Sequence, residues 1–120
     1  MMKSYEVAIT LAKALDSKKG NEIKVLHTEH LTTLADYFVI CSGTSNTQIK
    51  ALSEACEKVM DEAGEPAHHV EGHRDGTWVL LDFSNVVVHV FTEEARKFYD
   101  LERLWGDAQQ VDISDIVKPN

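Results

Sequence analysis

The stretch WVLLDFSNVVVHVF, residues 78–91, contains two strand-forming runs that are separated only by Ser84 and Asn85. Two such runs joined by two residues are typical of a β-hairpin with a tight turn. This register places Leu80 opposite His89, and successive side chains alternate between the two faces of the hairpin. One face is apolar throughout and is predicted to face the core; it consists of Val79, Leu81, Phe83, Val86, Val88 and Val90.

The opposite face of the hairpin is of mixed character. It includes a histidine and a carboxylate, which are rarely buried without a partner, so we expect this face to be at least partly exposed. An exposed apolar patch on a small domain often marks a partner site, and tryptophan is a frequent anchor of such sites. The alternative, which the hairpin alone leaves open, is a helix that covers this face and leaves Asp82 at its rim. The residues concerned are Trp78, Leu80, Asp82, Val87, His89 and Phe91.

Outward from the hairpin, apolar periodicity predicts an alternation of helices and strands. The run 37–41 is β-branched and aromatic throughout, which is typical of a strand buried on both faces. The order predicts one α/β domain with a mixed β-sheet flanked by helices. The expected elements before the hairpin are a helix over 3–18, a strand over 22–27, a strand over 37–41, a helix ending near residue 62 and a strand over 67–70.

The last helix is predicted to begin after Thr92, whose hydroxyl is a typical N-cap, and to end at Gly106. Residues 107–120 form an acidic, semi-polar tail, with a short strand expected near residues 111–117. The apolar stripe of this helix is predicted to be Ala95, Phe98, Leu101 and Trp105.

The 120 residues carry a formal net charge of −8, which fits a single small domain with an uneven charge distribution. Residues 1–60 hold 7 basic and 7 acidic residues, whereas residues 61–120 hold 5 basic and 13 acidic ones. Without a basic surface, direct nucleic-acid binding is disfavoured and a basic protein partner is allowed. Neither an apolar run of membrane-spanning length nor a signal peptide is recognisable, so a cytoplasmic protein without a membrane partner is expected.

Residue patterns for catalysis or metal binding are weak. Cys41 and Cys56 lack zinc-site spacing and are expected to be reduced and buried. His68 and His69 point to opposite faces of a strand, so with His73 they do not predict a metal site. No catalytic residue, cofactor or metal is therefore expected.

The turn 42–45 follows the buried strand and precedes a helix, so it is able to cradle a phosphate with backbone N–H groups. The preferred interpretation is that Gly43 permits a tight turn and that Thr44 or Ser45 caps the helix. A strand, such a turn and a helix also open the nucleotidyltransferase fold, but its Asp-x-Asp metal ligands occur nowhere in the chain. A nucleotide-binding enzyme of nucleotidyltransferase type is therefore kept as the alternative function.

Two long motifs resemble those of the Iojap, or ribosomal silencing factor, family. The first is DYFVICSGTS at residues 36–45, and the resemblance extends over residues 4–108. It implies a nucleotidyltransferase-like fold lacking catalytic carboxylates, in a domain over 1–108 followed by a tail over 109–120. One departure is the hairpin turn, where Ser84-Asn85 replaces the usual Gly-Asp of the family. The second motif comprises Glu71-Gly72, Trp78, Asp82, residues 86–91, Arg96, Phe98-Tyr99, Leu101-Glu102 and Leu104-Trp105.

The resemblance implies a translation repressor rather than an enzyme. Members bind a basic ribosomal protein, number fourteen, at the inter-subunit face of the large ribosomal subunit, block subunit joining and, in organelles, act in ribosome biogenesis. Free members are often homodimers. Carried onto this sequence, the partner contact is expected at Trp78, Leu80, Asp82 and His89, with Glu102 pairing with basic residues of the partner.

Overall fold

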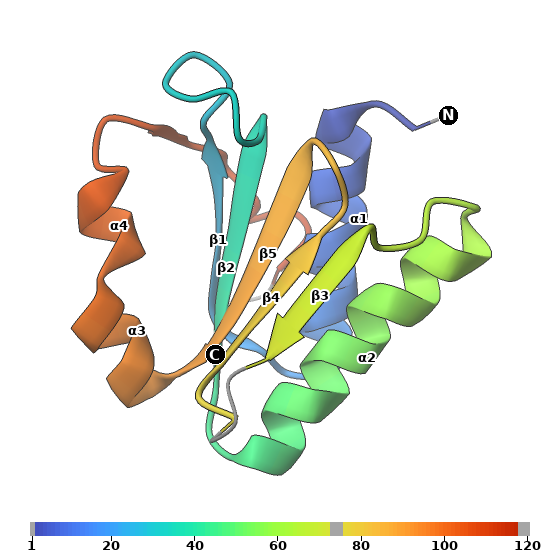
Figure 1. Ribbon diagram of the computed structural model, residues 1–120, viewed down its shortest axis with the longest axis vertical. Coiled ribbons are helices and arrows are strands. Elements are labelled where there is room, and N and C mark those ends of the chain that lie inside the picture. Colours follow the sequence, from blue (N-terminus) through green and yellow to red (C-terminus); the bar gives the residue numbers. More distant parts are fainter. Residues whose placement is uncertain (1, 73–75, 118–120) are drawn as a thin grey trace.

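The computed structural model describes residues 2–72 and 76–117. They form one α/β domain with a six-stranded mixed sheet, which confirms the predicted fold class (Figure 1). No helix in these two ranges is long and apolar enough to cross a bilayer. The elements are α1 (Ser4–Ser17), β1 (Asn21–His27), β2 (Tyr37–Gly43), α2 (Asn46–Glu62), β3 (His69–Gly72), β4 (Trp78–Asp82), β5 (Val86–Thr92), α3 (Glu93–Tyr99), α4 (Leu101–Leu104) and β6 (Gln109–Gln110).

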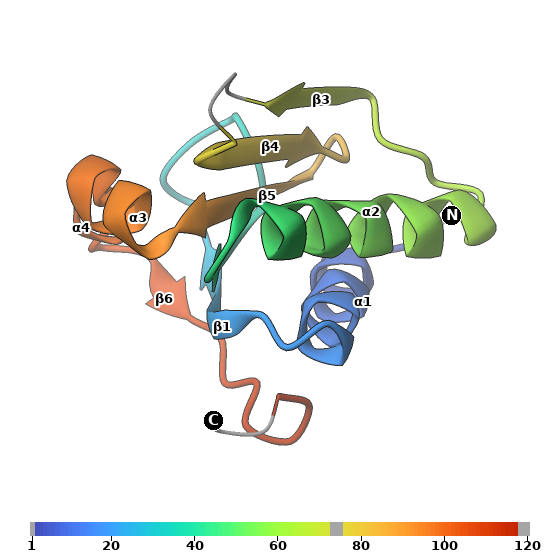
Figure 2. The same ribbon diagram turned by 90° about the horizontal axis from the view of Figure 1, so that it is seen from below.

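The strands lie in the order β3-β4-β5-β2-β1-β6, and only the neighbours β2 and β5 run parallel. Helices α1 and α2 cover one face of the sheet, and α3 and α4 lie on the other (Figure 2). Because α2 follows β2 and α3 follows β5, the chain leaves the two parallel strands toward opposite faces. Every residue of β2 is buried, as predicted for a strand covered on both sides.

The hairpin has the predicted register. Leu80 pairs with His89, and the N–H of Phe83 donates to the carbonyl of Val86 at 2.9 Å across the turn. Ser84 adopts a left-handed φ of 75°, and its N–H donates to the Asp82 carboxylate at 2.8 Å. The predicted core face packs under α1 and α2 as part of the larger hydrophobic cluster.

Helix α2 begins as the turn chemistry indicates. The hydroxyl of Ser45 accepts the N–H of Gln48 at 3.1 Å, which confirms Ser45 as the N-cap. At the end of α1, Lys19 takes the left-handed conformation, and the N–H of Gly20 returns to the carbonyl of Leu15 at 2.9 Å. A Cβ on Gly20 would overlap the Cys41 sulfur, so a glycine is needed here for close packing.

The last predicted helix is broken in two. Asp100 has a φ of 48° and separates α3 from α4, so the single continuous helix predicted here is wrong. Three residues of its predicted stripe, Ala95, Leu101 and Trp105, do pack in the smaller hydrophobic cluster. Phe98, predicted to be buried, is 81% exposed. The cause is the neighbouring Arg96, whose guanidinium is anchored in the sheet and rotates α3 so that Ala95 and Arg96 face inward.

The chain beyond α4 returns to the sheet. The final strand is β6, two residues earlier than expected, and it pairs with β1. The N–H of Val111 then donates to the carbonyl of Val25 at 2.8 Å. Three side chains of this segment, Val111, Ile113 and Val117, pack against the larger core cluster.

Candidate functional site

The mixed face of the hairpin is covered over one half. Helices α3 and α4 pack on β5, β2 and β1, so that Phe91 is 1% and His89 5% exposed. The expectation that His89 lies at a partly exposed surface is therefore wrong, and the alternative of a covering helix holds for this half. The buried members of the cluster under these helices are Leu26, Ala35, Phe38, Ile40, Phe91 and Ala95.

The other half of this face has no helix packed over it among the described residues. Strand β3 adds two side chains on the same side of the sheet, because His69 pairs with Asp82 and Glu71 pairs with Leu80. The side chains of His69 and Glu71 are 59% and 68% exposed. We call the following set the open face: His69 and Glu71, which are exposed, and Trp78, Leu80, Asp82 and Val87, which are partly buried.

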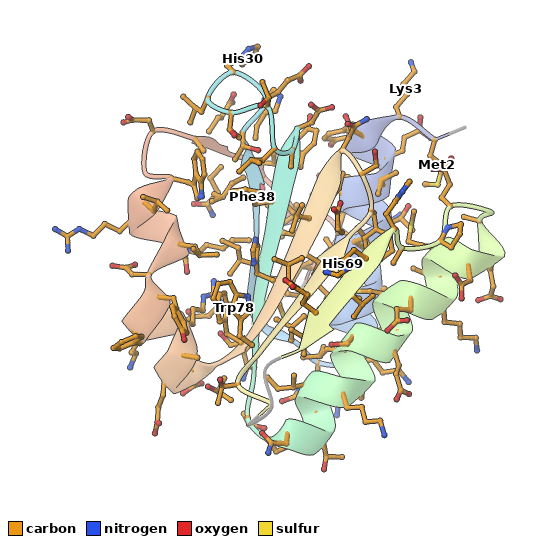
Figure 3. The ribbon with its side chains drawn as sticks, viewed as in Figure 1. Met2, Lys3, His30, Phe38, His69 and Trp78 are labelled. Carbon is orange, nitrogen blue, oxygen red and sulfur yellow. The ribbon has the colours of Figure 1, made fainter. Side chains whose placement is uncertain are left out.

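Trp78 lies at the border between the covered and the open half. In Figure 3 its side chain lies on the side of the sheet that faces α3. Its ring centroid is 5.0 Å from that of Phe91 and 4.6 Å from that of Tyr99 on α3. Its indole N–H donates to Nδ1 of His89 at 3.2 Å. Trp78 therefore joins the packed cluster to the open face.

His89 has an unusual environment for a titratable group. Its Nε2 atom is the one buried side-chain nitrogen or oxygen in residues 2–72 and 76–117 without a hydrogen-bond partner. Burial lowers the pKa of His89 to about 4, because the charged imidazolium loses its hydration. The ring is therefore neutral at pH 7.

Glu102, a predicted partner contact, is held within the molecule. Its carboxylate accepts a hydrogen bond from Nε of Arg96 at 2.7 Å and lies 3.4 Å from Nζ of Lys24. Burial favours a higher pKa for Glu102, but the hydrogen bond and charge of Arg96, with those of Lys24, outweigh it and lower the pKa. The side chain of Glu102 is 30% exposed, so it is only partly removed from solvent.

Arg96 appears in the sequence only as part of the second motif, but in the structure it is the centre of a buried hydrogen-bond network. It is 7% exposed and donates to the carbonyls of Asn21 and Glu22 at 3.3 and 2.8 Å, and to the Ser42 hydroxyl at 2.8 Å. The two carbonyls converge on it because β1 has an irregular register there and Glu22 adopts a φ of 47°. No sequence signal marks these acceptors, since they are backbone atoms some 75 residues away in the chain.

The turn after β2 lies at the carboxyl ends of the parallel strands, where α/β proteins commonly bind ligands. A surface cavity of about 360 Å³ is present there. However, the Thr44 N–H already donates to the Gln48 side chain at 2.6 Å, and Glu93 and Glu94 line the cavity. An occupied N–H and two nearby carboxylates disfavour a bound phosphate.

The cysteines and histidines that were considered for catalysis or metal binding are mostly buried or lie apart from one another. Cys41 and Cys56 are both free and buried, as expected, and burial raises the pKa of the Cys41 thiol to about 12. His68 and His69 are exposed on or beside β3, and His73 lies outside the described residues. In residues 2–72 and 76–117, no three His, Cys, Asp or Glu side chains are grouped to hold a metal ion.

Comparisons with known proteins agree with the fold and the motifs. The family model described as ribosomal silencing factor during starvation matches residues 1–120. The ribosomal silencing factor RsfS of Halalkalibacterium halodurans is 36% identical over 116 residues, covering 97% of this chain and 99% of the relative. The chloroplastic protein Iojap of Zea mays is 36% identical over 109 residues, covering 88% of this chain and 46% of that protein. A crystal structure of a Chromobacterium violaceum protein is 39% identical, covers 92% of each chain and superposes with a TM-score of 0.85. The chain belongs to the ribosomal silencing factor family.

Proposed function

We propose that this protein represses translation by binding the large ribosomal subunit through its open face, which blocks joining of the small subunit. The partner is a basic large-subunit protein, number fourteen, as the family resemblance implies. The relatives' names, ribosomal silencing factor and Iojap, support the ribosomal role. A related role in large-subunit biogenesis belongs to the same proposal, since a mouse relative is named for mitochondrial assembly of the ribosomal large subunit.

The observation that carries the proposal is the division of the sheet surface. On one face α1 and α2 pack over the apolar residues of β4 and β5, whereas on the other face β3 and the neighbouring part of β4 keep a partly apolar surface that no described helix covers. Leu80 lies in the middle of this surface, between Trp78 and Asp82 on the same strand face. An aromatic and an aliphatic side chain within a polar rim is the usual composition of an interface centre.

Charge supports a basic protein partner over RNA. The open face includes the carboxylates of Glu71 and Asp82, and residues 61–120 carry the whole net charge of −8. Such a surface repels phosphates and attracts a basic surface during diffusional encounter. Glu102, the other acidic residue expected at the contact, adds little to this field because its carboxylate is paired with Arg96 and Lys24.

The test is a pair of matched substitutions, Leu80→Glu and Leu34→Glu. Leu80 is partly buried in the open face, whereas Leu34 is 68% exposed in the segment between β1 and β2, outside that face. Both variants are checked for folding by thermal unfolding, and their binding to purified bacterial large ribosomal subunits is measured by co-sedimentation. Subunit joining is followed on sucrose gradients after small subunits are added.

We expect Leu80→Glu to weaken binding at least about tenfold and to restore subunit joining, since it places a charge in a desolvated contact. Leu34→Glu should bind like the wild type. If folded Leu80→Glu sediments with large subunits as well as Leu34→Glu does, the open face is not the ribosome contact.

The free protein is proposed to be a homodimer, again on the family resemblance. Light scattering of the same two variants shows whether self-association uses this surface. A monomeric Leu80→Glu protein beside a dimeric Leu34→Glu protein would mean that dimer and ribosome compete for the open face.

A further inference from the structure

The contact between Trp78 and His89 links the buried half of the sheet face to the open half. The two residues lie on the same side of neighbouring strands, offset diagonally because Trp78 pairs with Phe91 and Leu80 pairs with His89. The indole N–H donates to Nδ1 of His89 at 3.2 Å. The acceptor is 5% exposed, whereas the donor side chain is only partly buried.

This hydrogen bond determines the tautomer of the neutral imidazole. Nδ1 accepts only when its lone pair is free, so the proton of the neutral ring is on Nε2. Nε2 is buried without a hydrogen-bond partner in the described part of the chain. A buried donor without a partner is unfavourable, and a phenylalanine ring would avoid that cost. Packing alone therefore does not account for a histidine here, and the acceptor atom Nδ1 is its specific contribution.

The surroundings keep the ring neutral. The rings around His89 are Phe38 from β2, at 5.3 Å and perpendicular, Phe91 from β5, and Trp78 from β4. Helix α3 contributes the phenol of Tyr99, which packs on Trp78 and Phe91, and β4 carries Asp82 further along. Burial is the cause of the lowered pKa of His89. The acceptor is thus available throughout the physiological pH range.

We infer that His89 is a positioning residue for partner binding, which holds the Trp78 indole in one orientation at the border of the open face. This inference rests on the proposed function, since it assigns a role to Trp78 in that contact. The surface is then ordered before the partner arrives, and less conformational entropy is lost on binding. His89 itself is too deeply buried to touch a partner, so the contact expected there from the sequence is replaced by an indirect role.

A double-mutant cycle tests this inference with His89→Phe, Trp78→Phe and the double variant. His89→Phe keeps an aromatic ring and removes both the acceptor and the unpartnered donor. We expect its thermal unfolding midpoint to be no lower than that of the wild type, while its affinity for purified bacterial large ribosomal subunits falls roughly three- to tenfold, the usual effect of one hydrogen bond. In the Trp78→Phe background, His89→Phe should have no further effect on binding.

A spectroscopic measurement adds a readout that a merely structural role would not change. The indole N–H resonance of Trp78 is assigned by its loss in Trp78→Phe, which separates it from that of Trp105. In the wild type it should exchange slowly with water and keep its chemical shift between pH 8 and pH 6, because His89 stays neutral there. In His89→Phe the resonance should shift and exchange faster.

The outcomes separate this inference from the proposed function. If Trp78→Phe and Leu80→Glu weaken binding but His89→Phe does not, the positioning role is wrong and the open face remains the contact. If His89→Phe weakens binding equally in the Trp78→Phe background, His89 acts by another route and the inference is again overturned. If neither Trp78→Phe nor Leu80→Glu weakens binding, the proposed function itself fails.

Discussion

The two faces of the sheet are built from alternate residues of the same strands but differ in how they are covered. On β4, Leu81 points under α1 and α2 and is fully buried, whereas its neighbour Leu80 points to the open face and is only partly buried. The face under α1 and α2 therefore stabilises the fold, and half of the opposite face stays accessible. Successive side chains of a strand point to opposite sides of the sheet, so β4 contributes to the core on one side and to the open face on the other.

The helices on the two faces are also held differently. Helices α1 and α2 present long apolar stripes, and their buried residues belong to the larger core cluster. Helix α3 has seven residues and buries only Ala95 and Arg96, so the hydrogen bonds of the Arg96 guanidinium add to a small apolar contact that includes the ring of Tyr99. Apolar packing dominates the first face, whereas the second combines a smaller apolar cluster with the buried polar contacts of Arg96.

The largest effect that distinguishes the two faces is expected from truncating neighbouring leucines. Leu81→Ala should lower the free energy of unfolding by about 4 kcal/mol, because it leaves a cavity under α1 and α2. Leu80→Ala should cost less than about 1 kcal/mol in stability. Urea unfolding measures both values. Equal losses in the free energy of unfolding at the two positions would show that the open face is packed as tightly as the face under α1 and α2.

The next effect is expected from the anchor of α3. Arg96→Met should cost about 3 kcal/mol, because the carbonyls of Asn21 and Glu22 and the carboxylate of Glu102 lose a buried charged donor. Hydrogen exchange should show faster opening of α3 and α4, with α1 and α2 unchanged. Lys97→Met is the matched control, since this side chain is exposed one position along the same helix. A similar loss in both variants would contradict the anchoring role.

The smallest effect is a pH dependence of stability that arises from His89, on the covered half of the mixed face. His89 has a folded-state pKa of about 4 and an unfolded value near 6.5, so the unfolded chain binds more protons between these values. Stability should therefore fall as the pH drops through this window, by about 2 kcal/mol between pH 7 and pH 5 from this group. His89→Phe should remove that component in urea unfolding at the two pH values. An unchanged pH dependence between pH 7 and pH 5 in His89→Phe would contradict this assignment, since the lowered pKa of Glu102 places its own contribution below this window.

The hairpin and its two faces were predictable because a two-residue turn fixes the register and a period of two fixes which way each side chain points. The buried strand β2 was predictable for a similar reason, since a run of apolar β-formers has no polar side to expose. The rotation of α3 was not predictable. Phe98 fits an apolar stripe by spacing, but Arg96 turns the helix the other way through acceptors that are remote in sequence.

The sequence by itself determined the register of the hairpin, its division into an apolar and a mixed face, and the family to which the chain belongs. The tertiary structure alone decided that the mixed face is half covered, that His89 lies beneath the cover and that Trp78 stands at its border. The physical reason is that local spacing sets the direction of a side chain, whereas its burial depends on what packs against it. In this protein, the placement of α3 and α4 over the mixed face involves the left-handed conformation of Asp100 and the β1 carbonyls that bind Arg96. A pattern of side chains reveals neither feature.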